Sequence, residues 1–304
     1  MRSLFITGAT GFIGRSLLSS LDLRAYEIVY CLARRPLQPF KHSFRSENVQ
    51  FVTGSLEQPE TWAPLLTPAT TVVHLAAATG KTAPERYFSV NTKGTESLLS
   101  ACRKANSKNF LYVSSIAAKF PDKRRYPYAR SKELAEEAVK RSGIRYTIIR
   151  PTVVIGRDAP LWQGLLRLAR QPIILLPGDG RTRIQPIYID DLVACLGSIL
   201  DENIFADETF EVGGPEAIAI EDFIGAVHAR MSGKRPKVIH VPLKPMLSLL
   251  GLLEPGLRHV LPVTAGQLSA FYQDGTIEPN RLFRRHSATM KRIPEMLNLV
   301  LNHE

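Results

Sequence analysis

Cysteine is scarce in this chain of 304 residues, and its three cysteines are widely separated. Cys31, Cys102 and Cys195 have none of the paired spacings that a disulfide framework or a zinc site requires. We therefore expect no bound metal, and we expect the protein to work in a reducing compartment, the cytoplasm.

Long apolar runs are also missing. No run reaches the roughly 18 residues of a membrane-spanning helix. The apolar start at residues 4–6 is interrupted by residues 7–14, and no small-residue cleavage site follows, which argues against a signal peptide. We interpret this start as a strand and expect a protein that is soluble or at most peripheral to a membrane.

Motifs for nucleic-acid binding are absent, although the net charge of +11 is strongly basic. Basic residues gather at 41–45, 119–125 and 281–292, but without a helix-turn-helix, a zinc finger or the aromatic and basic pattern of an RNA-binding domain. We expect no nucleic-acid partner and interpret most of these residues as solvated surface. Contact with an anionic membrane or with a protein complex is the alternative.

The first fourteen residues, MRSLFITGATGFIG, are typical of a strand, a tight glycine turn and the start of a helix. Gly8, Gly11 and Gly14 follow the apolar residues at three-residue spacing. Glycine tolerates positive φ, and its missing Cβ lets backbone N–H groups approach a pyrophosphate at the positive end of the helix. The pattern predicts a dinucleotide site, and a purely structural turn is the alternative.

Residues 27–33 (EIVYCLA) predict a second strand, and two arginines follow it. Arg34 and Arg35 stand where an NAD-preferring unit typically has an acidic residue for the adenosine ribose. Guanidinium groups bind a 2′-phosphate through paired, charge-assisted hydrogen bonds. The pair therefore favours NADP over NAD; in the alternative interpretation both side chains lie in solvent.

Short apolar runs predict four more strands, at residues 49–53, 71–78, 110–115 and 146–149. After the first of these, Ser55 and Leu56 are placed to hold an adenine ring. The next one ends in small residues, including Ala76 and Ala77, as expected where a cofactor passes close to a strand end. His74 lies within this run, and we interpret it as a packing residue without a chemical role.

Tyr128 and Lys132 are four residues apart in a predicted helix, so both lie on one helical face. A tyrosine ordinarily has a pKa near ~10, and a nearby ammonium group favours its phenolate. The same lysine is placed to bind the nicotinamide ribose, and a serine hydroxyl at the end of the preceding strand is placed to polarise a carbonyl. The pattern predicts acid–base chemistry beside a hydride donor.

Taken in order, these segments resemble the extended short-chain dehydrogenase/reductase superfamily, which includes nucleotide-sugar epimerases and dehydratases. The similar segments are TGATGFIG (7–14), HLAA (74–77), YVSS (112–115), YARSK (128–132), RPTVVIG (150–156), PGDGRTRIQPIYIDDL (177–192) and FEVGGPE (210–216). QPIYIDDL and the tail from residue 261 (LPVTAGQL) are similar to an atypical branch near an accessory subunit of respiratory complex I, in which some members bind NADPH without known turnover. RPTVVIG also resembles ketone and flavonoid reductases.

The resemblance implies a catalytic trio of Ser115, Tyr128 and Lys132, with Ser114 as a cofactor-contacting or structural residue. It also implies that residues 151–153 pack on the nicotinamide. The residues expected to bind the cofactor are Gly8, Thr10, Gly11, Phe12, Ile13, Gly14, Arg34, Arg35, Ser55, Leu56, Ala76, Ala77, Ser114, Tyr128, Lys132, Pro151, Thr152 and Val153.

Two departures from the family pattern argue against a nucleotide-sugar substrate. Val153 stands where sugar-nucleotide enzymes usually have an asparagine, and residues 184–186 (IQP) stand where they carry an arginine. A sugar diphosphate needs such polar and cationic groups. We therefore expect an apolar, non-nucleotide substrate.

The second half shows a different rhythm, with helices predicted at residues 161–170, 190–200 and 220–231 and a strand at residues 238–241. Asp190 and Asp191 are interpreted as helix-start carboxylates rather than as a metal or acid–base pair. The Leu-rich stretch at residues 245–261 has almost no polar face. A helix packed in this lobe is the simplest interpretation; an apolar substrate mouth and an interfacial helix on anionic lipid are the alternatives.

The predicted fold class is α/β, with a doubly wound, mainly parallel Rossmann sheet over residues 1–156. Parts of residues 180–215 return to this domain, and residues 157–304 form a smaller, mixed substrate lobe interleaved with it. The predicted function is hydride transfer between NADP(H) and a carbonyl or alcohol on an apolar small molecule. A nucleotide-sugar epimerase or dehydratase, and a non-catalytic NADP-binding scaffold or assembly protein, are the alternatives.

Overall fold

The computed structural model describes residues 2–35, 47–257 and 264–301. The basic cluster at residues 41–45 and the first three residues of the tail from residue 261 lie outside this part of the chain.

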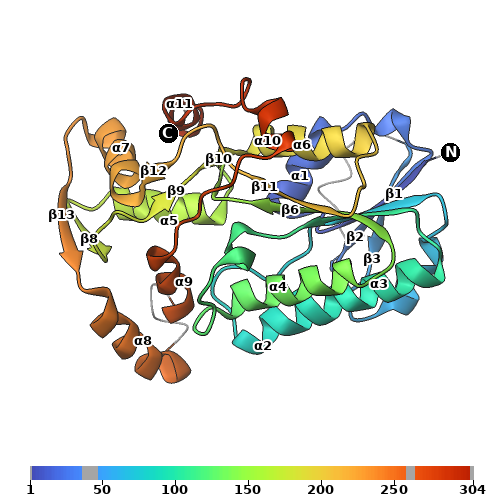
Figure 1. The fold of residues 1–304 in the computed structure, drawn as a ribbon, viewed down its shortest axis with the longest axis horizontal. Coiled ribbons are helices and arrows are strands. Elements are labelled where there is room, and N and C mark those ends of the chain that lie inside the picture. Colours follow the sequence, from blue (N-terminus) through green and yellow to red (C-terminus); the bar gives the residue numbers. More distant parts are fainter. Residues whose placement is uncertain (1, 36–46, 258–263, 302–304) are drawn as a thin grey trace.

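Seven parallel strands form the central sheet, in the order β11-β6-β5-β4-β1-β2-β3 (Figure 1). The strands are β1 (Ser3–Thr7), β2 (Ile28–Ala33), β3 (Val49–Thr53), β4 (Thr70–His74), β5 (Asn109–Val113), β6 (Arg145–Pro151) and β11 (Glu208–Val212). Most are short, largely apolar runs because helices cover both faces of the sheet. The predicted doubly wound α/β class is confirmed.

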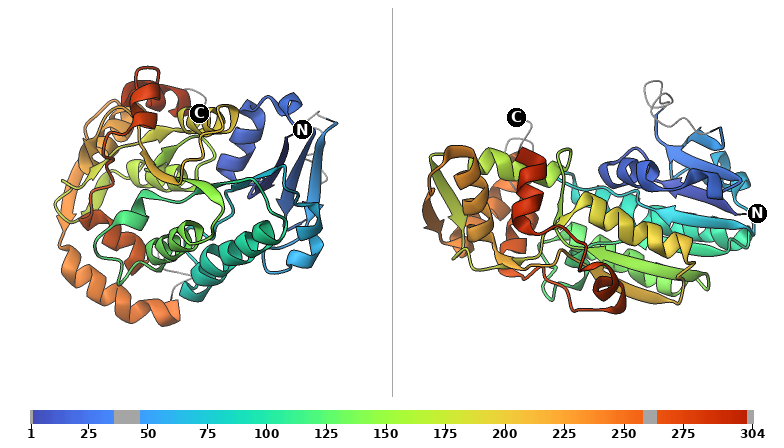
Figure 2. Two further views of the ribbon diagram at one scale, coloured as in Figure 1. Left: turned by 45° about the vertical axis from the view of Figure 1, so that its right-hand side comes forward. Right: turned by 90° about the horizontal axis from the view of Figure 1, so that it is seen from above.

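Two helical layers enclose this sheet, as the views in Figures 1 and 2 show. The helices of one layer are α1 (Phe12–Ser20), α6 (Ile189–Asp201) and α10 (Arg281–His286). Those of the other are α2 (Pro84–Tyr87), a π-helical turn (Phe88–Lys93), α3 (Gly94–Lys104) and α4 (Pro127–Lys140). Each layer packs on its own face of the sheet through a separate apolar core.

The C-terminal lobe lies beyond one end of the sheet (Figure 1). Its helices are α5 (Pro160–Ala169), α7 (Ile220–Ser232), α8 (Leu243–Leu257), α9 (Ala265–Ser269) and α11 (Ile293–Leu301). Its short strands pair as β7 (Val154–Ile155) with β10 (Ile187–Tyr188), β9 (Arg183–Ile184) with β12 (Ile218–Ala219), and β8 (Ile173–Pro177) with β13 (Lys237–Val241). Fully buried Trp162 and Phe223 belong to its core.

Several elements lie outside the sequence interpretation, among them β8, α10 and α11, which it did not predict. A π-helical turn directly precedes α3. Asp190 and Asp191 lie in the first turn of α6, as predicted. Among the described residues no helix combines the length and the apolar character needed to cross a membrane.

Candidate functional site

The predicted site residues follow strand ends at a single edge of the sheet, because all seven strands run in the same direction. The register pairs Thr7 at the end of β1 with Leu32 on β2 and with His74 on β4, so the loops that follow begin side by side. Strand order reverses between β1 and β4, where α/β sheets form a crevice for ligands.

The glycine turn after β1 has no space for side chains. Gly8 has a φ of +74°, and a Cβ there would lie 2.6 Å from the backbone nitrogen of Ala76. A Cβ on Gly14 would lie 2.2 Å from the carbonyl oxygen of Gly8. α1 starts after Gly11 without a side-chain cap, so its first N–H groups face the turn free for an anion. The cradle fits a dinucleotide pyrophosphate.

The remaining residues of this turn are placed around the cradle. Thr10, Phe12 and Ile13 are partly exposed. The ring of Phe12 packs against Gly156, where a Cβ would lie 2.6 Å from Cζ. This contact explains the glycine that ends RPTVVIG, and it joins the first helix to the C-terminal lobe.

His74 is fully buried and links the end of β1 to α3 through its two ring nitrogens. The Thr95 hydroxyl donates to the Asn91 carbonyl at 2.6 Å, so its oxygen accepts from His74 Nε2 at 2.9 Å. Nδ1 then accepts from the Thr7 hydroxyl at 2.6 Å. Burial, with a smaller contribution from the charge of Lys132, lowers the pKa of His74 to about 3. The imidazole is a neutral packing residue, as the sequence interpretation held.

The loops after β2, β3 and β4 carry the other expected cofactor contacts. Arg34 and Arg35 are exposed directly after β2, next to the glycine turn. Ser55 is partly exposed after β3, whereas Leu56 is buried against Gly94 of α3. Ala76 and Ala77 line the loop after β4 and are partly exposed.

Tyr128 lies in the first turn of α4, which begins with Pro127 in a position that suits its fixed φ. Its partly exposed ring contacts Tyr87 edge-on, with centroids 5.9 Å apart, and lies 5.8 Å from the ring of Tyr126. Burial raises the pKa of Tyr128 above its usual 10, and a hydrogen bond with Ser115 opposes the shift. The structure thus brings the expected serine and tyrosine together.

Lys132 lies one helical turn further along α4 and is 2% exposed. Its Nζ donates to the carbonyl oxygen of Val113 at 2.8 Å and lies 4.5 Å from the ring centre of Tyr112. Burial lowers the pKa of Lys132 to about 7, and the charge of Glu136 opposes this shift. A lysine in this state responds strongly to any nearby negative charge.

A buried ionic group behind this lysine was missed by the sequence interpretation. Glu136 accepts from the Ser114 hydroxyl at 2.6 Å and from Nε and Nη2 of Arg150 at 2.9 and 2.6 Å. Ser114, expected to contact cofactor or to be structural, is thus buried and bonded to a carboxylate. In the sequence, Glu136 follows Lys132 by four residues, which places both on one side of α4. That spacing does not reveal that Arg150 on β6 is the partner of Glu136.

Tyr128, Lys132 and Glu136 lie on one side of α4, which faces the end of β5. Lys132 donates to the carbonyl of Val113, Glu136 accepts from the hydroxyl of Ser114, and Ser115 lies close enough to Tyr128 to oppose the rise in its pKa. Ser115 also caps the short helix Ile116–Lys119 by accepting from the N–H of Ala117 at 3.3 Å. This capping bond holds Ser115 in place near Tyr128.

The segment after β6 faces the C-terminal lobe. Pro151 is buried, and the Thr152 hydroxyl donates to the carbonyl of Gln185. The Gln185 side chain donates to the carbonyl of Gly214 at 2.6 Å and accepts from the N–H of Ile277 at 3.0 Å. Val153 is partly exposed and packs in the core of the lobe.

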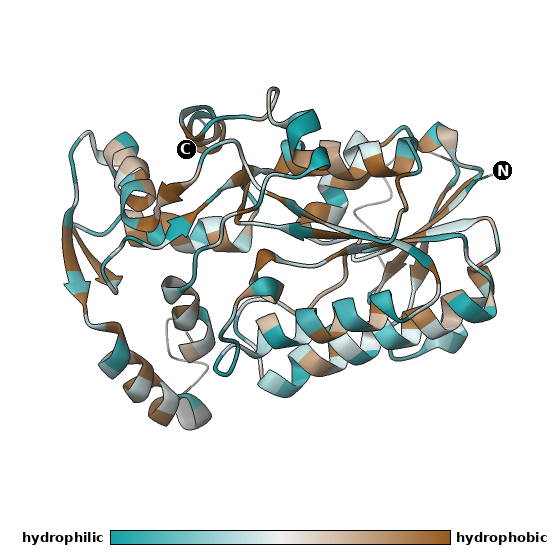
Figure 3. Ribbon diagram, viewed as in Figure 1, coloured by the Kyte–Doolittle hydropathy of each residue, from teal (hydrophilic) through white to brown (hydrophobic). Residues whose placement is uncertain are grey.

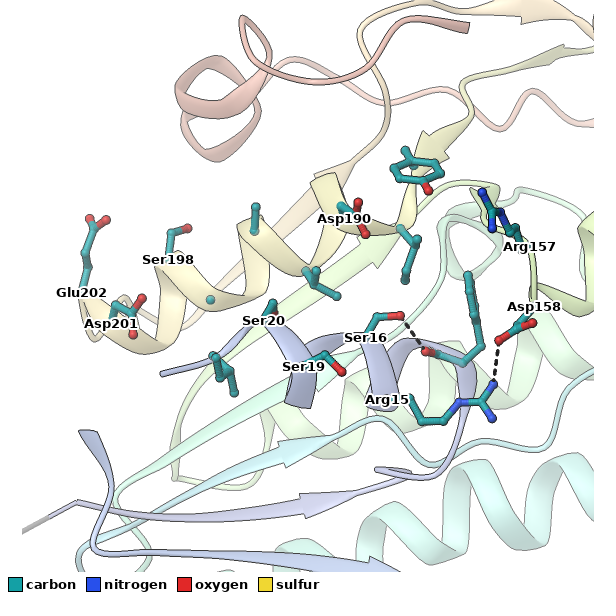
Figure 4. A pocket seen from close by; sticks show the side chains of 17 residues that line it. Arg15, Ser16, Ser19, Ser20, Arg157, Asp158, Asp190, Ser198, Asp201 and Glu202 are labelled. Carbon is teal, nitrogen blue, oxygen red and sulfur yellow. Dashed lines mark hydrogen bonds and ion pairs between the residues drawn. The ribbon is translucent and has the colours of Figure 1, made fainter. Parts of the chain in front are cut away.

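A separate groove of about 850 Å³ lies between α1 and α6 (Figure 4). Arg15 and Asp158 form an ion pair of 3.4 Å in its wall, and Asp190 and Asp201 also line it. The groove lies on the sheet face opposite α4 and contains none of the three expected catalytic residues. Its size alone therefore does not mark it as the site of chemistry.

Comparison with known proteins identifies the family of this chain. The sequence model of the NAD dependent epimerase/dehydratase family matches residues 4–213. The chain is 30% identical to a ceramide reductase from Caulobacter vibrioides over 238 residues, which are 78% of this chain and 73% of that protein. It is 26% identical to the mitochondrial NADH dehydrogenase [ubiquinone] 1 alpha subcomplex subunit 9 of Arabidopsis thaliana, across 78% of this chain and 60% of that protein.

Solved structures show the same fold. A dTDP-glucose 4,6-dehydratase from Streptomyces venezuelae with bound NAD superposes with a TM-score of 0.74 at 17% identity, covering 98% of this chain and 95% of the other. The family match extends from β1 through β11, and so includes the glycine turn and the Tyr128–Lys132 pair. The chain belongs to the NAD dependent epimerase/dehydratase family.

Proposed function

We propose that this protein is an NADP(H)-dependent reductase that transfers hydride between the cofactor and a carbonyl or alcohol on an apolar small molecule. The observation that carries the proposal is the arrangement on α4, where Tyr128 lies beside Ser115 and buried Lys132, one turn further along, donates to the carbonyl of Val113. Bound NADPH would supply the hydride, and the Gly8–Gly14 turn would hold its pyrophosphate.

The three side chains have complementary roles in this proposal. Tyr128 gives a proton to the carbonyl oxygen during reduction and takes it back in the reverse direction. Lys132, as an ammonium, stabilises the phenolate and anchors the nicotinamide ribose. Ser115 donates to the same carbonyl oxygen as negative charge develops there.

The side chains that face the lobe favour an apolar substrate over a sugar diphosphate. The Gln185 amide is occupied by the backbone of Gly214 and Ile277, and it carries no positive charge. The side chain of Val153, two residues after the end of β6, carries no hydrogen-bonding group. The relative named as a ceramide reductase supports reduction of a lipid-like carbonyl, whereas the match to the UDP-glucose 4-epimerase of Vibrio cholerae, at 25% identity, favours the epimerase alternative.

Turnover of a substrate panel tests this function. Purified protein is incubated with NADPH and either long-chain ketones or UDP- and dTDP-sugars, and loss of NADPH absorbance and product mass are followed. The proposal expects oxidation of NADPH with the apolar ketones only. Conversion of a sugar nucleotide without net NADPH consumption would establish the epimerase alternative, and no turnover with any substrate would favour a scaffold.

Cofactor preference gives the first prediction. Replacing Arg34 and Arg35 by Ala is expected to weaken NADPH binding roughly 10- to 100-fold, because a charge-assisted hydrogen bond contributes about 1.5–3 kcal/mol. NADH lacks the 2′-phosphate and should bind the variant as it binds the parent. Isothermal titration with both cofactors measures the ratio. Arg103→Ala, an exposed arginine on α3, is the matched control, and equal weakening of both cofactors would contradict the assignment.

A further inference from the structure

The small sheet of the C-terminal lobe exposes apolar side chains on its outer face. Ile173 and Leu175 of β8 are 44% and 56% exposed, while Ile174 and Leu176, which alternate with them along the strand, are fully buried. The register places Ile239 of β13, 41% exposed, beside Leu175, and exposed Lys237 beside Ile173. A strand face open to water ordinarily carries polar residues, so this face is unusual.

The next element continues the apolar surface. α8 follows β13 after one residue, and Leu243 at its start contacts the turn at Gly178 that follows β8. Leu247 and Leu250 pack inward on α9, whereas Leu249 and Leu252 are 56% and 78% exposed. Figure 3 shows apolar segments on β8, β13 and α8 along the same end of the molecule. We call Ile173, Leu175, Ile239, Leu249 and Leu252 the lobe face.

Basic residues outnumber acidic ones in the segments that form the lobe face, although Glu221 pairs with His240 of β13 at 2.8 Å and Glu254 lies on α8. Residues 223–253, which include β13 and most of α8, contain five lysines and arginines and no carboxylate. Residues 159–178, which include β8, contain two arginines and no carboxylate. Lys237 and Lys244 are exposed beside the apolar residues. Exposed apolar side chains with lysines beside them complement a surface that is apolar in its interior and negatively charged at its outer boundary.

We propose that the lobe face docks on an anionic membrane surface. The exposed leucines and isoleucines enter the boundary between head groups and acyl chains, and the lysines contact the lipid phosphates. A protein partner would have to supply both an apolar patch and a surrounding acidic rim.

The lobe face is linked to the candidate site through α9. Leu268 of α9 packs in the same cluster as Leu247 and Leu250 of α8. Gly266 of α9 lies against the loop before Tyr128, where a Cβ would lie 2.7 Å from the carbonyl oxygen of Arg125 and 3.3 Å from the ring of Tyr126. Through α9, the helix α8 that would contact the membrane is therefore packed against the loop that leads into α4.

Vesicle sedimentation tests the proposal without substrate or cofactor, so its outcome is independent of the proposed reaction. The full chain is mixed with vesicles of phosphatidylcholine alone or with roughly a third phosphatidylglycerol. We expect sedimentation with the anionic vesicles at low salt and loss of binding as salt is raised. Protein that stays in solution with both vesicles overturns the proposal and leaves a protein partner as the use of this face.

Paired variants separate the two contributions. Leu249→Ser with Leu252→Ser should reduce the partition coefficient at least about tenfold, because each leucine gains free energy on burial. Lys237→Gln with Lys244→Gln should reduce it by a similar factor on anionic vesicles and have no effect on neutral ones. Leu299→Ser on α11 and Lys104→Gln on α3 are the matched controls. Variants of the lobe face that sediment like the parent also overturn the proposal.

Discussion

Replacing Tyr128 by Phe is expected to lower kcat roughly 10²- to 10⁴-fold, the range that a positioned general acid contributes. The substitution removes the hydroxyl beside Ser115 but keeps the ring that packs against Tyr87 and Tyr126. The glycine cradle is formed by β1, α1 and the loop after β4, so it is unaffected. NADPH affinity should therefore stay within about twofold of the parent, since only one hydroxyl is lost.

Steady-state turnover and cofactor titration of the same preparation distinguish chemistry from folding. Tyr146→Phe is the matched control. Tyr146 lies near the start of β6, at the opposite edge of the sheet, and is partly buried in the core beneath α3 and α4. That variant should turn over substrate like the parent. Unchanged kcat in Tyr128→Phe would refute the assignment of this phenol as the acid, whereas loss of both NADPH binding and turnover would show that the substitution disturbs the fold.

Features that depend on neighbours in sequence were predictable. The glycine turn is local, and the structure shows why two of its glycines are required, since a Cβ at Gly8 or Gly14 would meet backbone atoms. The spacing of four between Tyr128 and Lys132 places them on one side of α4 in any helix. The doubly wound, mainly parallel sheet followed from the alternation of strands and helices together with the family resemblance, and the structure contains it.

Features that depend on the packing of distant segments could not be predicted from the sequence. The bond from Arg150 to Glu136 requires β6 to lie beside β5 with α4 across both, which no local pattern encodes. β8 has a solvent-facing side as apolar as its buried side, so the alternation that identifies a half-buried strand is missing. The role of Gln185 depends on two loops, at Gly214 and Ile277, that are far away in sequence.

Replacing Glu136 by Gln is expected to lower the free energy of unfolding by about 3 kcal/mol. The substitution keeps the shape of the side chain but takes away the carboxylate that accepts two hydrogen bonds from Arg150. Arg150 is only 18% exposed, so its charge cannot turn fully to water. Breaking a buried pair costs roughly 3–5 kcal/mol, and the lower value applies because Glu211 still lies 3.6 Å from Arg150.

Urea unfolding monitored by circular dichroism measures this loss, and the same helix offers the control. Glu133 pairs with Lys123 at 2.9 Å and with Arg130 on the outer side of α4, where its side chain is 28% exposed. Surface pairs contribute up to about 1 kcal/mol, so Glu133→Gln should change stability by no more than that. Equal destabilisation by the two variants would mean that the Glu136–Arg150 pair has no special weight in the fold.

Turnover of the Glu136→Gln variant should also depend differently on pH. If the ammonium form of Lys132 is the active one, the rate falls as pH rises through the pKa of this lysine. Burial lowers that pKa to about 7, and the carboxylate of Glu136 raises it in opposition. Removing the carboxylate lowers the pKa further, so the alkaline fall in kcat, measured at saturating NADPH, should begin at lower pH than in the parent. Glu133→Gln should leave this limb in place. If the alkaline fall in kcat stays at the same pH in Glu136→Gln, Glu136 has only a structural role. A residue that only stabilises the fold changes the amount of active protein, but not the pH at which Lys132 loses its proton.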